Sequence, residues 1–173
     1  MKKNWGKYLD EKYAYDGTLG AQYSPEETVF RLWSPAASKA YVNLYKSGNP
    51  STKKYKILPM QLIKDKVWVA VYKGDLKNMY YTYSVTINGK KQEAVDPYAK
   101  AAGVNGKRGM VVDLLSTNPP GWENDKSPPF KNPTDAIIYE LHIRDFSISE
   151  NSGMINKANT WHLQKKEQQI RKD

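Results

Sequence analysis

The sequence predicts an all-β fold, an immunoglobulin-like sandwich of the early-set type, and two observations support this prediction. Short segments rich in β-branched and aromatic residues recur between residues 28 and 114, and turn-forming residues separate them. No segment in this range shows the sustained apolar period of a long helix. About seven short strands with this spacing are typical of a β-sandwich.

The elements follow in order along the chain. Residues 1–12 are polar and aromatic without a clear period, and we expect an arm or a short helix there. The sandwich itself is predicted over residues 13–115. Its strands are predicted at residues 28–33, 39–45, 55–62, 67–72, 80–87, 91–95 and 109–114.

Local patterns justify individual strands. In residues 39–45 the apolar Ala40, Val42 and Leu44 alternate with polar or aromatic neighbours, as on a strand with one buried face. After residues 80–87, the pair Asn88-Gly89 predicts a type I′ hairpin turn, which makes residues 91–95 the return strand.

A different organisation is predicted after the sandwich. Residues 116–134 contain five prolines and no periodic pattern, which indicates a linker or a domain boundary. Residues 136–143 then form a nearly continuous apolar run, typical of a strand buried on both faces of a parallel sheet. Without neighbours, such a strand exposes apolar surface and unpaired backbone.

Four sequence motifs resemble those of the α-amylase superfamily, glycoside hydrolase family 13, and specifically type I pullulanases. Their order and spacing match that family over about residues 13–157. The motifs are YDGTLG with TVFRLWSPAA at 15–20 and 28–37, GDL with YYTY at 74–76 and 80–83, VDPYAKA with VNG at 95–101 and 104–106, and IYELHIRDFS at 138–147.

This resemblance implies hydrolysis of α-1,6-glucosidic bonds by a retaining mechanism, which needs two carboxyl groups about 5 to 5.5 Å apart. In the superfamily these groups lie on later strands of a (β/α)8 barrel. Residues 135–157 would be the start of that barrel, which needs about 250 residues. The family signature YNWGYDP is absent. We therefore expect an N-terminal fragment, truncated near the first barrel strand and inactive alone.

Two other functions are compatible with the sequence. The chain could be a stand-alone, non-catalytic module that binds an α-glucan such as pullulan, glycogen or starch. It could also complement a separately translated barrel, its natural intramolecular partner. Aromatic rings that line an exposed groove would favour the binding module, whereas packed rings would disfavour it.

Glucan binding requires exposed aromatic rings that stack on sugar faces. This requirement makes six residues candidates, although each ring could equally pack in the core or against another domain. The candidates are Trp33, Trp68, Tyr41, Tyr45, Tyr80 and Tyr81.

A second cluster lies in the barrel-like segment. The period of two places Glu140, His142 and Arg144 on one strand face, next to Asp145, and such groups can do acid–base work. We favour the interpretation that they are residues of a first barrel strand. His142 and His162 are the only histidines and cysteine is absent, so we expect no metal and no cofactor.

The net charge of +9 is compatible with nucleic-acid binding or with solvated lysines. The basic residues are scattered without a nucleic-acid motif, so we expect no nucleic-acid partner. No apolar run is long enough to span a membrane, and the N-terminus lacks the apolar region of a secretory signal. These features, with the absence of cysteine, predict a cytoplasmic protein that does not bind membranes.

The resemblance stops just after Lys157. Residues 158–173 are basic and weakly amphipathic, whereas the family continues with a sequence such as GKYLAFTE. For one choice of codons, a single G inserted in the Ala158 codon restores KGKYLAFTE. We interpret the tail as the product of a one-base deletion, and a natural divergent terminus is the alternative.

Overall fold

The computed structural model describes residues 5–127, 129–155 and 157–158. The chain forms two compact units, Met1–Trp122 and Glu123–Asp173. The boundary between them falls inside the Pro-rich segment 116–134. Apart from Ala158, the predicted frameshifted tail lies outside the described residues.

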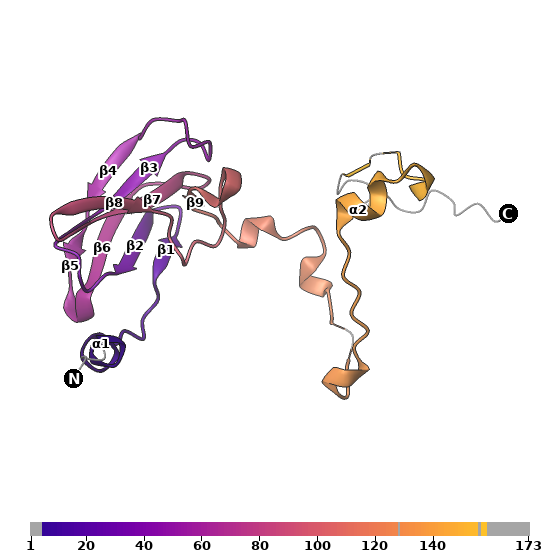
Figure 1. Cartoon of the computed structure of the whole chain (residues 1–173), viewed down its shortest axis with the longest axis horizontal. Helices are drawn as coiled ribbons and strands as arrows, with labels where there is room; N and C mark the ends of the chain where they lie inside the picture. Colours follow the sequence, from indigo (N-terminus) through magenta and orange to yellow (C-terminus); the bar gives the residue numbers. More distant parts are fainter. Residues whose placement is uncertain (1–4, 128, 156, 159–173) are drawn as a thin grey trace. The chain divides into compact units, whose positions relative to one another are not determined.

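The first unit is a sandwich of two antiparallel sheets, which confirms the predicted fold class (Figure 1). One sheet has the strand order β1-β2-β6-β5, and the other has the order β4-β3-β7-β8 with β9 also paired to β7. The strands are β1 Gly20–Tyr23, β2 Glu27–Trp33, β3 Lys39–Tyr45, β4 Lys56–Pro59, β5 Gln61–Leu62, β6 Val67–Lys73, β7 Tyr80–Ile87, β8 Lys90–Ala94 and β9 Gly109–Met110.

One predicted strand, residues 55–62, is divided between the two sheets. β4 pairs with β3, whereas β5 pairs with β6 of the opposite sheet. Met60 separates the two strands; it is 6% exposed and its N–H donates to the carbonyl of Ala40. The chain therefore changes sheets at a side chain that packs in the core, which an alternating pattern does not reveal.

The turn between β7 and β8 has the predicted conformation. Asn88 and Gly89 both have positive φ, 50° and 75°. A type I′ turn requires this left-handed backbone at both central positions. It sets the register in which Ser84 lies opposite Glu93.

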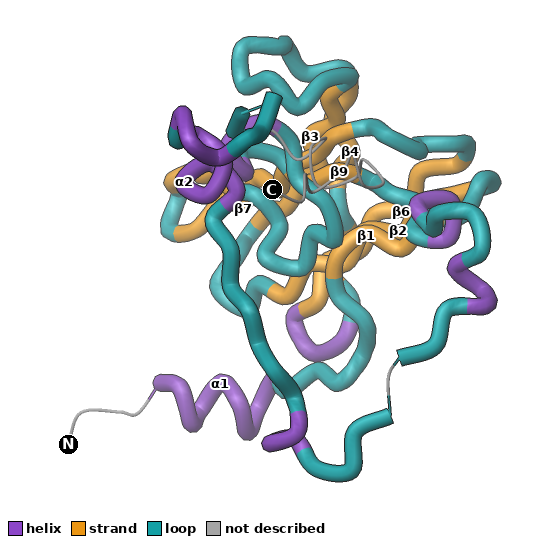
Figure 2. Tube along the Cα trace, turned by 90° about the vertical axis from the view of Figure 1, so that its right-hand side faces the viewer, coloured by secondary structure: helices purple, strands orange, loops and turns teal. Residues whose placement is uncertain are grey.

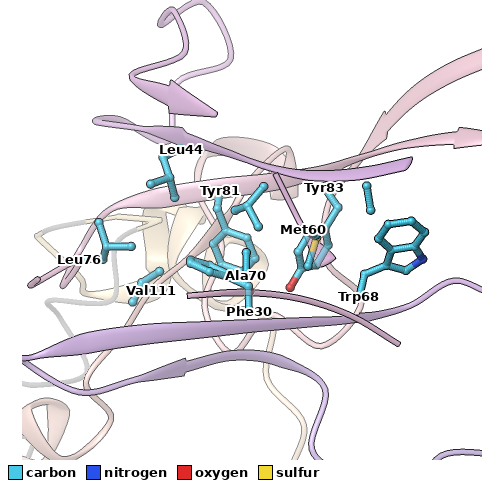
Figure 3. Packing of buried hydrophobic residues seen from close by; sticks show 11 residues of the cluster. Phe30, Leu44, Met60, Trp68, Ala70, Leu76, Tyr81, Tyr83 and Val111 are labelled. Atoms are coloured by element: carbon cyan, nitrogen blue, oxygen red, sulfur yellow. The ribbon is translucent and has the colours of Figure 1, made fainter. Parts of the chain in front are cut away.

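The core fills the space between the sheets. Phe30 from β2 and Tyr81 from β7 contact edge to face, with ring centroids 5.1 Å apart (Figure 3). Trp68 lies at one end of the cluster, and its indole N–H donates to the carbonyl of Ser34. The other buried members are Ala40, Val42, Leu44, Met60, Ala70, Leu76, Tyr83 and Val111.

Helix α1, Trp5–Tyr13, precedes the sheets and lies at one end of the sandwich (Figure 2). The indole N–H of Trp33 donates to the carbonyl of Tyr13 at 2.9 Å and ties the helix end to β2. Strand β1 was not predicted. The first unit also contains the 3₁₀ turns η1 Lys64–Lys66, η2 Val104–Gly106 and η3 Leu115–Thr117.

In the second unit, residues 136–142 do not form the predicted barrel strand. No ladder partner is assigned to them among the described residues, and Ile137 and Ile138 are 98% and 89% exposed. A strand needs a hydrogen-bonded neighbour, and no described segment pairs with these residues. The unit's helices are α2 Ile143–Ile148, η5 Pro133–Asp135 and η6 Glu150–Ser152, while η4 Trp122–Asn124 spans the boundary.

The described residues include no helix that is both long and apolar enough to cross a membrane.

Candidate functional site

The outer face of the sheet β4-β3-β7-β8 is polar and yet largely buried. On β3, Val42 and Leu44 face the core, so the period of two turns Asn43 and Tyr45 outward. Asn43 is fully buried and Tyr45 is 3% exposed. Buried polar atoms are costly unless they are hydrogen-bonded, which predicts a network on this face.

The network runs across three strands. The amide of Asn43 donates to the hydroxyls of Thr82 and Ser84 at 3.1 and 2.8 Å. Thr82 donates in turn to Glu93 at 2.6 Å, and the Tyr45 hydroxyl donates to the same carboxylate oxygen. The chain of bonds fixes Glu93 over the sheet.

Glu93 is held in its ionised form. Partial burial raises the pKa of its carboxyl, but hydrogen bonds from Lys54, Thr82 and Tyr45 outweigh this effect and lower the pKa to about 2. Lys54 Nζ lies 2.6 Å from the second carboxylate oxygen. Glu93 is therefore unsuited to donate a proton near neutral pH.

Arg108 organises the loop that follows β3. Its guanidinium donates to the carbonyls of Ser47, Asn49, Pro50 and Thr52 at 2.7 to 3.0 Å. Its Cζ also lies 3.5 Å from the centroid of the Tyr45 ring. One planar fork thus holds residues 47–52 in a single conformation, which the point charge of a lysine could not do.

These groups line a pocket of about 650 Å³. Its floor is the Tyr45, Thr82 and Glu93 network. Its walls are the loop after β3 and the turn around Asn105-Gly106, and its basic lining residues are Lys53, Lys54, Lys107 and Arg108. A volume of ~300–1,000 Å³ suits a small molecule or part of an oligosaccharide.

Three of the six predicted aromatic residues are buried. Trp68 and Tyr81 belong to the hydrophobic core, where they are 6% and 1% exposed. Their rings pack between the sheets, so neither has a face open to a sugar. Tyr45 lines the pocket, but the guanidinium of Arg108 covers its ring.

The other three predicted residues are partly exposed. Trp33 is tied to α1, and Tyr41 on the outer face has Lys91 Nζ 5.1 Å from its ring centroid. Tyr80 packs against the loop after β3, because a Cβ on Gly48 would lie 2.7 Å from its ring. The structure therefore brings only Tyr45 of the six into the pocket.

The sequence reasoning missed the residues that shape this pocket. Glu93 lies in the exposed strand KKQEA, and Arg108 follows a glycine-containing turn. Neither position has a local motif, since each acquires its role through partners between 11 and 61 residues away. Only the outward register of Tyr45 and Thr82 could have indicated a polar site.

The predicted cluster in the second unit has a different geometry. Because α2 begins at Ile143, Glu140, His142 and Arg144 do not share one strand face. His142 caps this helix by accepting from the N–H of Asp145, and its Nδ1 lies 3.1 Å from that carboxylate. Both side chains are about 70% exposed. The contact is a helix cap. In the described part of the chain, no group of acidic and histidine side chains is placed to hold a metal.

Comparison with known proteins defines the class. Residues 18–99 match carbohydrate-binding module 48, the isoamylase N-terminal domain, and this part of the chain belongs to that family. The match covers the strands β1 to β8 and the whole pocket floor of Tyr45, Thr82 and Glu93.

Most of the chain is similar to pullulanases. It is 41% identical over 152 residues to the pullulanase of Bacillus subtilis strain 168 and 37% identical over 156 residues to chloroplastic pullulanase 1 of Arabidopsis thaliana. These alignments include 87% and 82% of this chain but 20% and 16% of the relatives. The chain thus spans about a fifth of their length.

A solved pullulanase structure is also similar to this chain over part of its own length. The pullulanase of Paenibacillus barengoltzii, in complex with maltohexaose and α-cyclodextrin, superposes with a TM-score of 0.83 at 49% identity. The superposition covers 91% of this chain and 24% of that protein. The chain therefore carries a carbohydrate-binding module 48 domain of the kind found in pullulanases, as its motifs predicted.

Proposed function

We propose that this chain is a non-catalytic, α-glucan-binding part of a pullulanase-type α-1,6-glucan debranching hydrolase. The observation that carries the proposal is the family match of residues 18–99 within a chain that is pullulanase-like over most of its length. The relative from Paenibacillus barengoltzii binds maltohexaose and α-cyclodextrin. The pocket beside Glu93 is the glucan site that we propose.

The chemistry of the described carboxylates supports a binding role. A retaining glycosidase needs one carboxyl group that stays protonated at its working pH. Glu93 is ionised and held by three donors. Asp96 is buried and accepts from the Tyr81 hydroxyl and the N–H of Tyr98, so it serves the fold.

Affinity electrophoresis tests this proposal. We expect gels that contain pullulan or amylopectin to retard the chain relative to gels without polysaccharide. Pullulan incubated with the chain should release no reducing ends. Unchanged mobility in both gels would contradict glucan binding, and release of maltotriose would contradict the non-catalytic role.

A second function, docking onto a catalytic domain, is favoured by a separate surface. Leu114 and Leu115 are 49% and 82% exposed beside the edge strand β1. With Ala21 and Tyr23 they line a shallow cavity of about 220 Å³. Exposed leucines next to a cavity are typical of an interface. Replacement of both by serine should weaken co-purification with a separately produced pullulanase barrel, whereas unchanged recovery would argue against docking here.

A further inference from the structure

The pocket beside Glu93 has an excess of positive charge. Among the described residues, four basic side chains line it, Lys53, Lys54, Lys107 and Arg108, against one carboxylate, that of Glu93. Only Lys54 makes an ion pair with that carboxylate. Among the described residues, no carboxylate lies within ion-pair distance of the other three.

Of the four basic residues, Arg108 carries the charge that most needs an anionic partner. Its side chain is buried, with the residue 5% exposed, and its donors meet only carbonyl oxygens and the Tyr45 ring. Carbonyls satisfy its hydrogen bonds without neutralising it. A buried cation beside a cavity raises the positive potential inside that cavity.

Glu93 does not neutralise the charges of Lys53, Lys107 and Arg108. Its two oxygens already accept from Tyr45, Thr82 and Lys54, and its charge is balanced by Lys54. Lys53 and Lys107 are exposed at the rim, where their ammonium groups are available to a ligand.

The pocket offers a neutral sugar hydrogen-bonding groups but no open aromatic ring among its described residues. Tyr45 is the one aromatic residue that lines it in the described part of the chain, and Arg108 covers that ring. A neutral glucan can therefore bind here through hydrogen bonds but without stacking, which leaves its binding weak. The volume of about 650 Å³ nevertheless exceeds what a lone oxyanion fills.

We propose that this pocket recognises a phosphate monoester carried on an α-glucan, with the phosphate bound by Lys53 and Lys107 and the attached sugar over the Thr82–Glu93 floor. The dianion matches the unpaired positive charges, and ammonium–phosphate hydrogen bonds are charge-assisted. The glucan part of this inference rests on the proposed function.

Calorimetric titration of the full chain tests the inference with three probes: maltohexaose, maltohexaose bearing one 6-phosphate, and glucose 6-phosphate. We expect the phosphorylated glucan to bind about tenfold more tightly than the neutral one at low salt, and the advantage to shrink as salt screens it. The Lys53→Ala/Lys107→Ala variant should lose the advantage. The matched Lys39→Ala/Lys90→Ala variant removes the same charge away from the pocket and should keep it.

The outcomes separate the two proposals. Equal binding of neutral and phosphorylated maltohexaose overturns phosphate recognition and leaves glucan binding standing. Binding of neither overturns both. A phosphate advantage that survives in Lys53→Ala/Lys107→Ala overturns this pocket as its location, provided that the variant keeps the thermal midpoint of the natural chain. Glucose 6-phosphate that binds as tightly as the phosphorylated glucan supports the phosphate site and overturns the glucan part.

Discussion

At the scale of single residues, Glu93 connects the pocket to the stability of the sandwich. Its pKa is lowered in the folded state, from 4.5 to about 2. The stabilisation is therefore fully present above pH 4.5 and is lost as the pH falls toward 2. Because the side chain is 36% exposed, solvent screening reduces the contribution to about 1 kcal/mol.

Glu93→Gln isolates this effect. Urea unfolding at pH 7 and pH 2 should show a larger loss of stability for the natural chain than for the variant, by about 1 kcal/mol. Other carboxylates titrate in both proteins and cancel in the comparison. Equal losses for the two proteins would show that the Glu93 network does not stabilise the fold.

Arg108 gives a second prediction at this scale. Arg108→Lys keeps the charge but loses the fork that binds four carbonyls, so we expect a cost of about 2–3 kcal/mol in the free energy of unfolding. The neighbouring Lys107→Ala, at an exposed position, should change it by less than about 0.5 kcal/mol. Chemical denaturation measures both. Similar small costs would mean that the loop after β3 is held by other contacts.

At the scale of elements, two loops meet where β3 ends and β9 begins. Gly48 and Gly103 approach closely, since a Cβ on Gly103 would lie 2.6 Å from the Gly48 Cα. Gly103 has a φ of −83°, which any residue can adopt. Glycine is therefore needed at this position because a side chain would not fit. At Gly89 a side chain would have room, since nothing lies near the Cβ position, but the φ of 75° favours glycine.

This contrast predicts different costs for the same substitution. Gly89→Ala should cost about 1 kcal/mol, the price of left-handed backbone for alanine. Gly103→Ala should cost more than 2 kcal/mol and should also weaken glucan binding, because the displaced loop forms the pocket wall. Thermal unfolding of both variants shows which substitution costs more stability. A smaller loss for Gly103→Ala would indicate that the loops separate easily.

The elements also show how far the sequence was informative. Strands with clear alternation or a turn signal, such as β3 and the β7–β8 hairpin, were predicted nearly to the residue. The division at Met60 and the edge strand β1 were not, because tertiary packing decides them. The pocket escaped prediction for the same reason: Arg108 meets its four carbonyl partners across more than 50 residues of chain.

At the scale of the whole molecule, the two units differ in what they bury. The first has a continuous core, whereas Ile137, Ile138 and Tyr139 of the second are 77% to 98% exposed. Such an apolar, unpaired segment is prone to self-association. A chain that ends at Trp122 should therefore unfold within about 2 °C of the full chain and aggregate less on heating.

Calorimetry and light scattering on both chains check this prediction. A midpoint that falls by roughly 8 °C or more in the shorter chain would mean that the second unit stabilises the first. Equal scattering from the two chains would show that the exposed isoleucines do not drive association.

The most direct test of the account is an NMR titration of the ¹⁵N-labelled full chain with maltohexaose. Amide shifts should concentrate in the loop of residues 47–54, at Thr82 and Glu93, and around residues 105–108, which together form the pocket. Trp68 and Tyr81, packed in the core, should change little. Shifts confined to other surfaces, or no shifts at saturating maltohexaose, would contradict a glucan-binding site beside Glu93.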